Sequence, residues 1–160
     1  MRTKPFTICL WYKANAEEAA NFYTSIFKNS SIGNITRFGK EGFEFHRIPE
    51  GTVMTMEFML NDMNFLALNG NQKSAFTSAT SIMLTCDTQE EIDYYWDALC
   101  SEGQEEPCGW LKDKFGMSWQ IVPAKLGQWM ANTKNSQEVT TALMGMKKID
   151  MNVLTEINNR

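Results

Sequence analysis

The chain has 160 residues, of which 43% are hydrophobic and 12% aromatic, and its formal net charge is −4 at pH 7. A chain of this length and hydrophobicity can bury one core or two small repeated cores, which excludes an intrinsically disordered protein. The negative charge, with Lys147-Lys148 as the only adjoining basic pair, argues against nucleic acid as a partner.

The sequence predicts neither export nor membrane insertion. The apolar run at residues 6–12 follows two basic residues, but it stops at Lys13, which is too short for a membrane span, and no cleavage pattern follows. We therefore expect a cytoplasmic protein without a membrane partner. The cysteines are Cys9, Cys86, Cys100 and Cys108. They lack the short paired spacings of zinc sites, so we expect no zinc bound by cysteines. A chain of this size can fold without disulfides, so we expect reduced thiols.

The first half of the chain alternates between strand and helix patterns. Residues 16–27 have apolar side chains at helical spacing, with Glu17 and Glu18 in the first turn and Asn15 as a candidate cap. The loop that ends at Gly51 carries the only histidine, His46. Strands are predicted at residues 6–12, 32–38, 52–60 and 63–68, the last two as a hairpin.

The second half repeats the order of the first. Ser81–Cys86 is a predicted strand, and the helix after it matches the first helix at an offset of 73 residues. At this offset Glu17-Glu18 recurs as Glu90-Glu91, and Phe22-Tyr23 recurs as Tyr95-Trp96. This coincidence of residue types indicates a duplicated structural unit.

A hairpin is predicted at residues 108–123, after a linker that runs through Pro107. Its turn is expected at Phe115-Gly116, and strand alternation then puts Trp119 and Gln120 on opposite faces. Gln120 is an amide in an apolar setting, so it is either satisfied by neighbouring strands or faces a cavity. Short helices are predicted at residues 125–131, 136–146 and 151–157.

Several motifs in both halves match the pattern of a known family. They are Leu10-Trp11-Tyr12, Glu17-Glu18-Ala19-Ala20-Asn21-Phe22-Tyr23, Gly51-Thr52-Val53-Met54-Thr55, Ala67-Leu68-Asn69-Gly70, Gly109-Trp110-Leu111-Lys112-Asp113, Phe115-Gly116 and Ser118-Trp119-Gln120. Over residues 7–149 the chain resembles the PhnB-like branch of the vicinal oxygen chelate superfamily, the glyoxalase and bleomycin-resistance fold. Members of this branch are often labelled 3-demethylubiquinone-9 3-methyltransferase-like.

The resemblance implies an α+β fold of two βαβββ modules, which form a curved mixed sheet around a cleft. The modules would span residues 5–70 and 80–123, joined by a connector at residues 73–80. A helical tail at residues 124–160 would complete a single domain. The resemblance also implies a homodimer.

Metal-dependent members of the superfamily take His and Glu ligands from the first and last strand of each module. The resemblance puts these positions at Ile8, within residues 65–69, at Ser81 and at Gln120, and none of them is His, Asp or Glu. Neutral side chains of these types compete poorly for zinc, iron or nickel. We therefore expect no metal and no cofactor.

Aromatic side chains are the stronger indication of a ligand site. Trp11, Trp110 and Trp119 occur on strands expected to line or edge the cleft. Core packing is the better explanation for any one of them, but less so for the three together. The predicted cleft residues are Trp11, Asn69, Ser81, Trp110, Trp119 and Gln120. No catalytic residue is assigned.

Three functions are consistent with the sequence. The first is a metal-free protein that binds a small molecule in an aromatic cleft. The second is a divergent metal-dependent lyase, isomerase or dioxygenase. The third is the methyltransferase of the family label, against which the first strand leads into Lys13-Ala14-Asn15, without the glycine-rich loop typical of enzymes that use S-adenosylmethionine.

Overall fold

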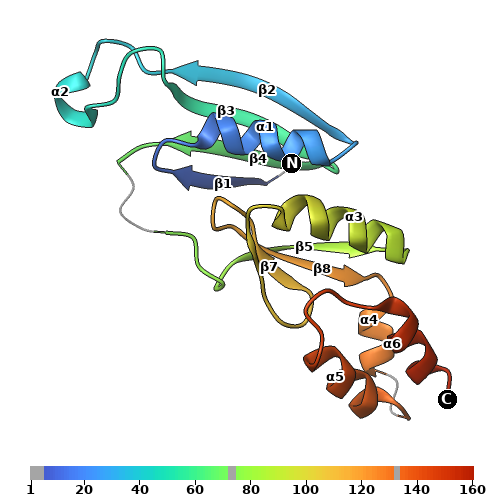
Figure 1. Ribbon diagram of the computed structural model, residues 1–160. Helices are drawn as coiled ribbons and strands as arrows, with labels where there is room; N and C mark the ends of the chain where they lie inside the picture. The colour runs from blue at the N-terminus through green and yellow to red at the C-terminus, as the bar shows by residue number, and fades with distance from the viewer. Residues whose placement is uncertain (1–5, 72–74, 132–133) are drawn as a thin grey trace, which may run out of the picture. The chain divides into compact units, whose positions relative to one another are not determined.

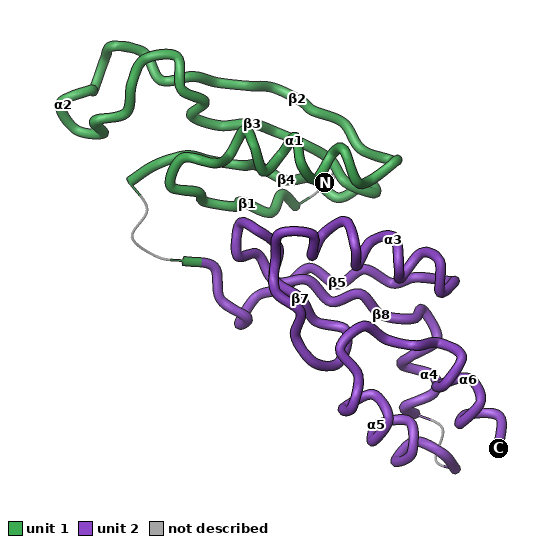
Figure 2. The backbone as a smooth tube through the Cα atoms, viewed as in Figure 1, with its two compact units in different colours: residues 1–75 green, residues 76–160 purple. Residues whose placement is uncertain are grey.

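The protein divides into two compact units, residues 1–75 and 76–160 (Figure 2). The structure, a computed structural model, describes residues 6–71, 75–131 and 134–160. The boundary between the units falls within the connector expected at residues 73–80. Pro5, the first residue of the expected first module, and residues 73 and 74 of the connector lie outside the described residues.

Unit 1 contains a four-stranded sheet with one long helix (Figure 1). Its elements are β1 (Thr7–Tyr12), α1 (Ala16–Ile26), β2 (Ser30–Arg37), α2 (Phe43–His46), β3 (Val53–Leu60) and β4 (Met63–Asn69). The strand order is β1-β4-β3-β2, with β1 parallel to β4 and the other pairs antiparallel. The short helix α2 lies where the sequence predicts only a loop, and this is a correction.

Helix α1 covers one face of the sheet of unit 1, and the core lies between them. Ala16, Ala19 and Ala20 are fully buried, because their small side chains let the helix approach the strands closely. The Tyr23 ring stacks on Phe58 at 6.1 Å, and Phe58 stacks on Phe65 at 5.0 Å. Aromatic pairs of this kind add about 0.5–1.5 kcal/mol each beyond the area that they bury.

The start of α1 is capped by a residue distant in sequence, not by its neighbour. Asn15 occupies the cap position, but its side chain donates to the Glu18 carboxylate and makes no capping hydrogen bond. The backbone N–H of Ala16 donates instead to Oδ1 of Asn69, at 2.9 Å. The prediction that Asn15 caps this helix is therefore wrong.

Unit 2 repeats the arrangement of unit 1 and adds three helices. Its elements are β5 (Ser81–Cys86), α3 (Gln89–Cys100), β6 (Gln104–Glu105), β7 (Trp110–Lys112), β8 (Ser118–Pro123), α4 (Leu126–Ala131), α5 (Ser136–Met144) and α6 (Met151–Asn158). The strand order is β5-β8-β7-β6, with β5 parallel to β8. The sequence predicts a linker where β6 lies. This strand is too short to show an alternating pattern, and it forms by pairing with β7.

The offset of 73 residues holds for the buried faces of the two long helices. Ala19, Tyr23 and Ile26 of α1 correspond to Ile92, Trp96 and Leu99 of α3, and all six are buried. Because equivalent helix positions are buried in both units, the repeat predicted from the sequence is also a structural repeat. The two sheets with their covering helices therefore form an α+β fold of two similar modules.

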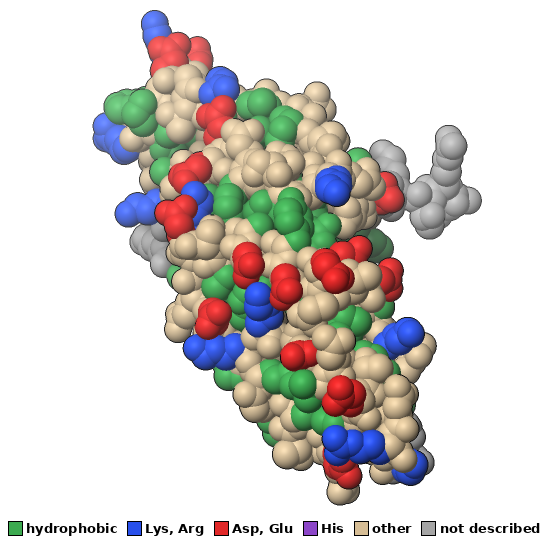
Figure 3. All heavy atoms as spheres, turned by 45° about the vertical axis from the view of Figure 1, so that its right-hand side comes forward, with side chains coloured by type: hydrophobic (Ala, Val, Ile, Leu, Met, Phe, Trp, Pro, Cys, Tyr) green, Lys and Arg blue, Asp and Glu red, His purple; other side chains and the backbone are tan. Residues whose placement is uncertain are grey.

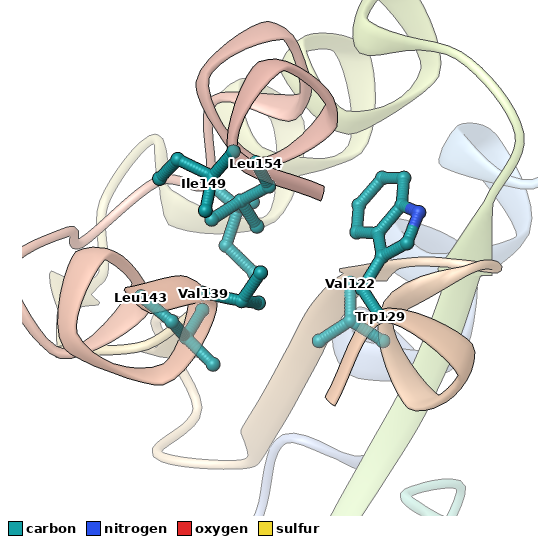
Figure 4. Close-up of a cluster of buried hydrophobic side chains, with 7 residues drawn as sticks. Val122, Trp129, Val139, Leu143, Ile149 and Leu154 are labelled. Atoms are coloured by element: carbon teal, nitrogen blue, oxygen red, sulfur yellow. The ribbon is translucent and has the colours of Figure 1, made fainter. Parts of the chain in front are cut away.

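The C-terminal helices of unit 2 pack around a hydrophobic cluster of their own (Figure 4). Trp129, Leu143 and Leu154 belong to this cluster together with Val122 of β8 and Ile149. Two backbone hydrogen bonds, from Cys108 to Met146 and from Gly109 to Lys147, join the segment before α6 to the residues that precede β7. Asp150 is the N-cap of helix α6, and its carboxylate accepts from the N–H groups of Asn152 and Val153.

Candidate functional site

Each sheet has one face covered by its long helix and an open face on the other side. Successive side chains of a strand point to opposite faces, so the register of the strands assigns each residue to one of them. In unit 1 the open face carries Trp11 and Cys9 of β1, Leu66 and Leu68 of β4, and Glu57 of β3. In unit 2 this side carries alternate residues of β5, β8 and β7, and the cluster of the C-terminal helices covers it at Val122.

Trp11 is a large apolar side chain on the open face of unit 1, and 47% of it is exposed. It pairs with Leu68 across the parallel β1–β4 ladder. Its indole lies against Gly70, where an added Cβ atom would be 2.7 Å from the indole nitrogen. Gly70 thus leaves room for the ring to lie along the end of β4.

Asn69 belongs to the covered side of unit 1, and only 3% of it is exposed. Its Oδ1 atom accepts from Ala16, and its Nδ2 atom donates to the Val53 carbonyl at 2.9 Å. Both ends of the amide are therefore used to hold α1 and β3 to the end of β4. Its role in the described structure is to join these elements.

The open face of unit 2 brings together Gln120, Ser81, Met83 and Trp110. Gln120 pairs with Met83 on one side and with Trp110 on the other, and its Nε2 atom donates to the Ser81 hydroxyl at 2.8 Å. Gln120, Ser81 and Trp110 are all half-buried. Three of the six predicted cleft residues are therefore close neighbours on one face.

A buried hydroxyl without a partner lies in the same part of unit 2. Ser118 precedes Gln120 by two residues on the same face of β8 and pairs with Ser81 in register. Its Oγ atom is buried and makes no hydrogen bond with any residue that the structure describes. A buried hydroxyl in this state costs about 1–3 kcal/mol unless another group satisfies it.

Trp119 lies on the face opposite to Gln120, toward α3. Only 1% of it is exposed, and its Nε1 atom donates to Oδ2 of Asp113 at 2.8 Å. The other oxygen of Asp113 accepts from the backbone N–H groups of Phe115 and Met117. This carboxylate therefore holds the β7–β8 turn closed and fixes the Trp119 ring in the core of unit 2.

The positions implied for metal ligands do not make a donor set for a transition metal. The register pairs Ile8 with the buried Phe65, so Ile8 belongs to the helix-covered side of the sheet, and Thr7 and Cys9 are its open-face neighbours. The amides of Asn69 and Gln120 are engaged in the hydrogen bonds described above. Among residues 6–71, 75–131 and 134–160, no three His, Cys, Asp or Glu side chains lie close enough to hold one ion.

A hollow on the open face of unit 1 was missed from the sequence. It has a volume of about 500 Å³ and crosses all four strands. Its side chains on this face are those of Thr7, Ser31, Glu57, Met59, Asn64 and Leu66. The sequence offered one signal for this hollow, which is Glu57. It is a carboxylate in the middle of an alternating apolar strand, on the face opposite to Met56 and Phe58.

The face of the molecule drawn in Figure 3 carries charged side chains of both signs. On the face drawn in Figure 3, Lys and Arg side chains are scattered among Asp and Glu and do not form a continuous basic patch. Among the described residues, none of the helices combines the length and the apolar character required to span a membrane.

Comparison with protein families gives a match over most of the chain. Residues 4–122 match the model of the family described as 3-demethylubiquinone-9 3-methyltransferase. A comparison with curated proteins gives no match.

Solved structures share this arrangement of strands and helices. The PhnB protein from Bacillus cereus is 37% identical, with 76% of this chain and 100% of that chain covered and a TM-score of 0.66. A Pseudomonas aeruginosa protein is 17% identical, with 76% and 98% covered and a TM-score of 0.62. The fosfomycin resistance protein FosX from Mesorhizobium loti is 14% identical, with 82% and 100% covered and a TM-score of 0.57. These similarities confirm the predicted two-module glyoxalase fold, which the fosfomycin resistance protein shares.

Proposed function

The chain belongs to the PhnB-like family described as 3-demethylubiquinone-9 3-methyltransferase, and from this premise we propose that it binds a small organic molecule without a metal ion. The observation that carries the proposal is the open face of each sheet. The helix-covered faces are filled by core side chains, whereas the open faces present Trp11 in unit 1 and the Trp110–Gln120–Ser81 group in unit 2. Apolar rings beside a few convergent polar groups are typical of small-molecule sites.

In this proposal, the tryptophans make the apolar contacts with the ligand and Gln120 makes the polar one. Trp11 and Trp110 offer apolar surface to a planar or apolar ligand. Gln120 keeps its Oε1 atom as an acceptor while its Nε2 atom is engaged with Ser81. Asn69 and Trp119 act indirectly in this proposal, since their polar atoms are used to hold α1 and the β7–β8 turn.

The binding proposal is tested by isotope-edited NMR of the full chain. The indole resonances of Trp11 and Trp110 and the side-chain amide of Gln120 are followed while naphthalene-2-carboxamide, a planar molecule with one amide, is added. We expect saturable shifts at one or more of these groups, with the Trp129 indole of the tail as an internal control. Equal shifts at all tryptophans, or none at saturating probe, would contradict the proposal.

The metal-free part of the proposal is tested by elemental analysis. One similar structure, a mutant of the fosfomycin resistance protein FosX from Listeria monocytogenes, was obtained as a complex with manganese(II) and a phosphonic acid. In this chain Gln120 stands at the position implied for a glutamate ligand. We expect no stoichiometric transition metal in the untagged protein or in the Gln120→Glu variant. About one zinc, iron, nickel or manganese ion per subunit would favour the metal-dependent lyase, isomerase or dioxygenase.

The proposal also covers methyltransferase activity, assembly, location and partners. Calorimetry with S-adenosylmethionine tests the methyltransferase, for which we expect no binding heat. We also propose a homodimer in the cytoplasm, with neither nucleic acid nor membrane as a partner. Light scattering that gave the mass of a monomer at micromolar concentration would exclude the dimer.

A further inference from the structure

The hollow on the open face of unit 1 has the size and the chemistry of a binding pocket. Its volume of about 500 Å³ lies within the range of about 300–1,000 Å³ that is usual for small-molecule sites. Two rows of paired residues form its floor. One row is Thr7, Asn64, Met59 and Ser31, and the other contains Leu66 and Glu57 beside Gly33.

The polar side chains of this pocket have unused hydrogen-bonding capacity. Oε2 of Glu57 accepts from the backbone N–H of Asn34 at 3.3 Å and from its Nδ2 atom at 2.9 Å. Oε1 of Glu57 and the side chains of Asn64 and Ser31 make no hydrogen bond within the described residues. The Asn34 contacts therefore orient the carboxylate and leave one of its oxygens available.

Glu57 is also the only charged side chain among the described residues that line this pocket. No Lys or Arg of the described chain forms an ion pair with it. Gly33 lies directly beside it, where an added Cβ atom would be 3.1 Å from the Cβ of Glu57. A side chain at position 33 would thus crowd the carboxylate. The pocket therefore contains a fixed negative charge without a counter-charge.

Apolar groups lie next to this carboxylate. Leu66 is its cross-strand partner, and Met59 lies two residues further along β3 on the same face. A ligand that satisfies both parts of the pocket needs a positive charge at one end and an apolar group at the other. A methionine side chain adapts readily to the shape of such an apolar group.

We propose that this pocket binds a small organic cation, with a protonated amine at Glu57 and an apolar group against Met59 and Leu66. The proposal rests on the proposed small-molecule function and specifies the ligand class and the residue that selects it. Asn64 and Ser31 add hydrogen bonds beside the amine. The attraction between unit charges about 4 Å apart gives a preference for cations that weakens as salt screens it.

The test uses three probes of similar shape and different charge. They are 2-phenylethylamine, which is a cation at pH 7, the neutral 2-phenylethanol and the anion phenylacetate. Each is titrated into the isotope-labelled full chain while backbone amide resonances are followed by NMR. We expect the amine to shift resonances of Thr7, Ser31, Glu57 and Asn64 and to bind at least about tenfold more tightly than the alcohol, a difference of about 1.4 kcal/mol. We expect no shift with phenylacetate.

Two variants assign the preference to Glu57. Glu57→Gln keeps an oxygen that accepts from Asn34 but removes the charge, so the affinity for the amine should fall about tenfold to that of the alcohol. Glu44→Gln removes a carboxylate from α2, outside the pocket, and should leave the affinity unchanged. Because the three probes are compared on the unchanged protein, the test does not depend on the folding of a variant.

The other outcomes overturn this inference. Equal affinity for the three probes, tighter binding of phenylacetate, or an equal effect of both variants would show that Glu57 does not select the ligand. Shifts confined to Trp110 and Gln120 would refute the pocket of unit 1 while leaving the proposed small-molecule function intact. No shift with the three probes or with naphthalene-2-carboxamide would refute both.

Discussion

The hydrogen bond between Asp113 and Trp119 predicts a specific energetic coupling in unit 2. Only 3% of Asp113 is exposed, and its two oxygens accept three N–H groups at 2.8, 2.9 and 3.0 Å. In Asp113→Asn, the amide oxygen can keep the two backbone donors, but the new NH₂ group then faces the indole N–H. One buried donor is left unsatisfied, which costs about 1–3 kcal/mol.

The loss of charge adds to this cost, because hydrogen bonds to charged groups contribute about 1.5–3 kcal/mol each, against about 1 kcal/mol for neutral pairs. We therefore expect Asp113→Asn to lower the free energy of unfolding by about 3 kcal/mol. Trp119→Phe removes the indole donor and leaves the carboxylate with its two backbone partners. We expect a smaller loss of about 1–2 kcal/mol, in which the reduced ring volume is included.

A double-mutant cycle isolates the bond itself. Urea unfolding followed by far-ultraviolet circular dichroism gives the free energy of unfolding of the protein, of both single variants and of the double variant. The double variant should lose about 1–2 kcal/mol less than the sum of the single variants, since the bond is lost only once. A coupling energy below about 0.5 kcal/mol would refute the reasoning, because mutations at distant, independent sites also depart from additivity by up to about this amount.

Two further predictions concern a pair of glycines and the cysteines. Gly109 and Gly116 both have positive φ, but only at Gly109 would an added Cβ atom meet other atoms, at 2.7 Å from Ile149 and from a backbone oxygen. In urea unfolding, Gly116→Ala should lower the free energy of unfolding by about 1–2 kcal/mol, and Gly109→Ala should lower it clearly more. Equal losses for the two variants would contradict the close packing around Gly109. Burial raises the pKa of the Cys86 thiol to about 12, with the Glu91 and Asp87 charges adding to it, so exposed Cys9 should react with a thiol reagent at pH 8 long before Cys86. Equal reactivity of all the thiols would refute the raised pKa of Cys86. The same pKa shift predicts that the free energy of unfolding falls as the pH rises above about 9, because the Cys86 thiol then ionises in the unfolded chain but not in the folded one.

The long helices and most strands could be predicted because their signals are local. The apolar residues of α1 and α3 recur every three or four positions, and the same positions are buried in the structure. Strand alternation likewise put Trp119 and Gln120 on opposite faces of β8, as the register confirms. Elements without such periodicity were missed. They are β6 and α2, of two and four residues.

The sequence by itself thus determined the repeated order of strands and helices, and with it the two-module fold. Only the tertiary structure decided which face of each strand is covered, and therefore what each polar side chain does. Asn69 caps a helix that begins 53 residues before it, and Glu57 is oriented by Asn34 from 23 residues away. Periodicity reports the repeat of one element, whereas a hydrogen-bond partner across a sheet depends on strand order and register. The local pattern determines neither of these, so the hollow around Glu57 could be recognised only when the four strands were paired.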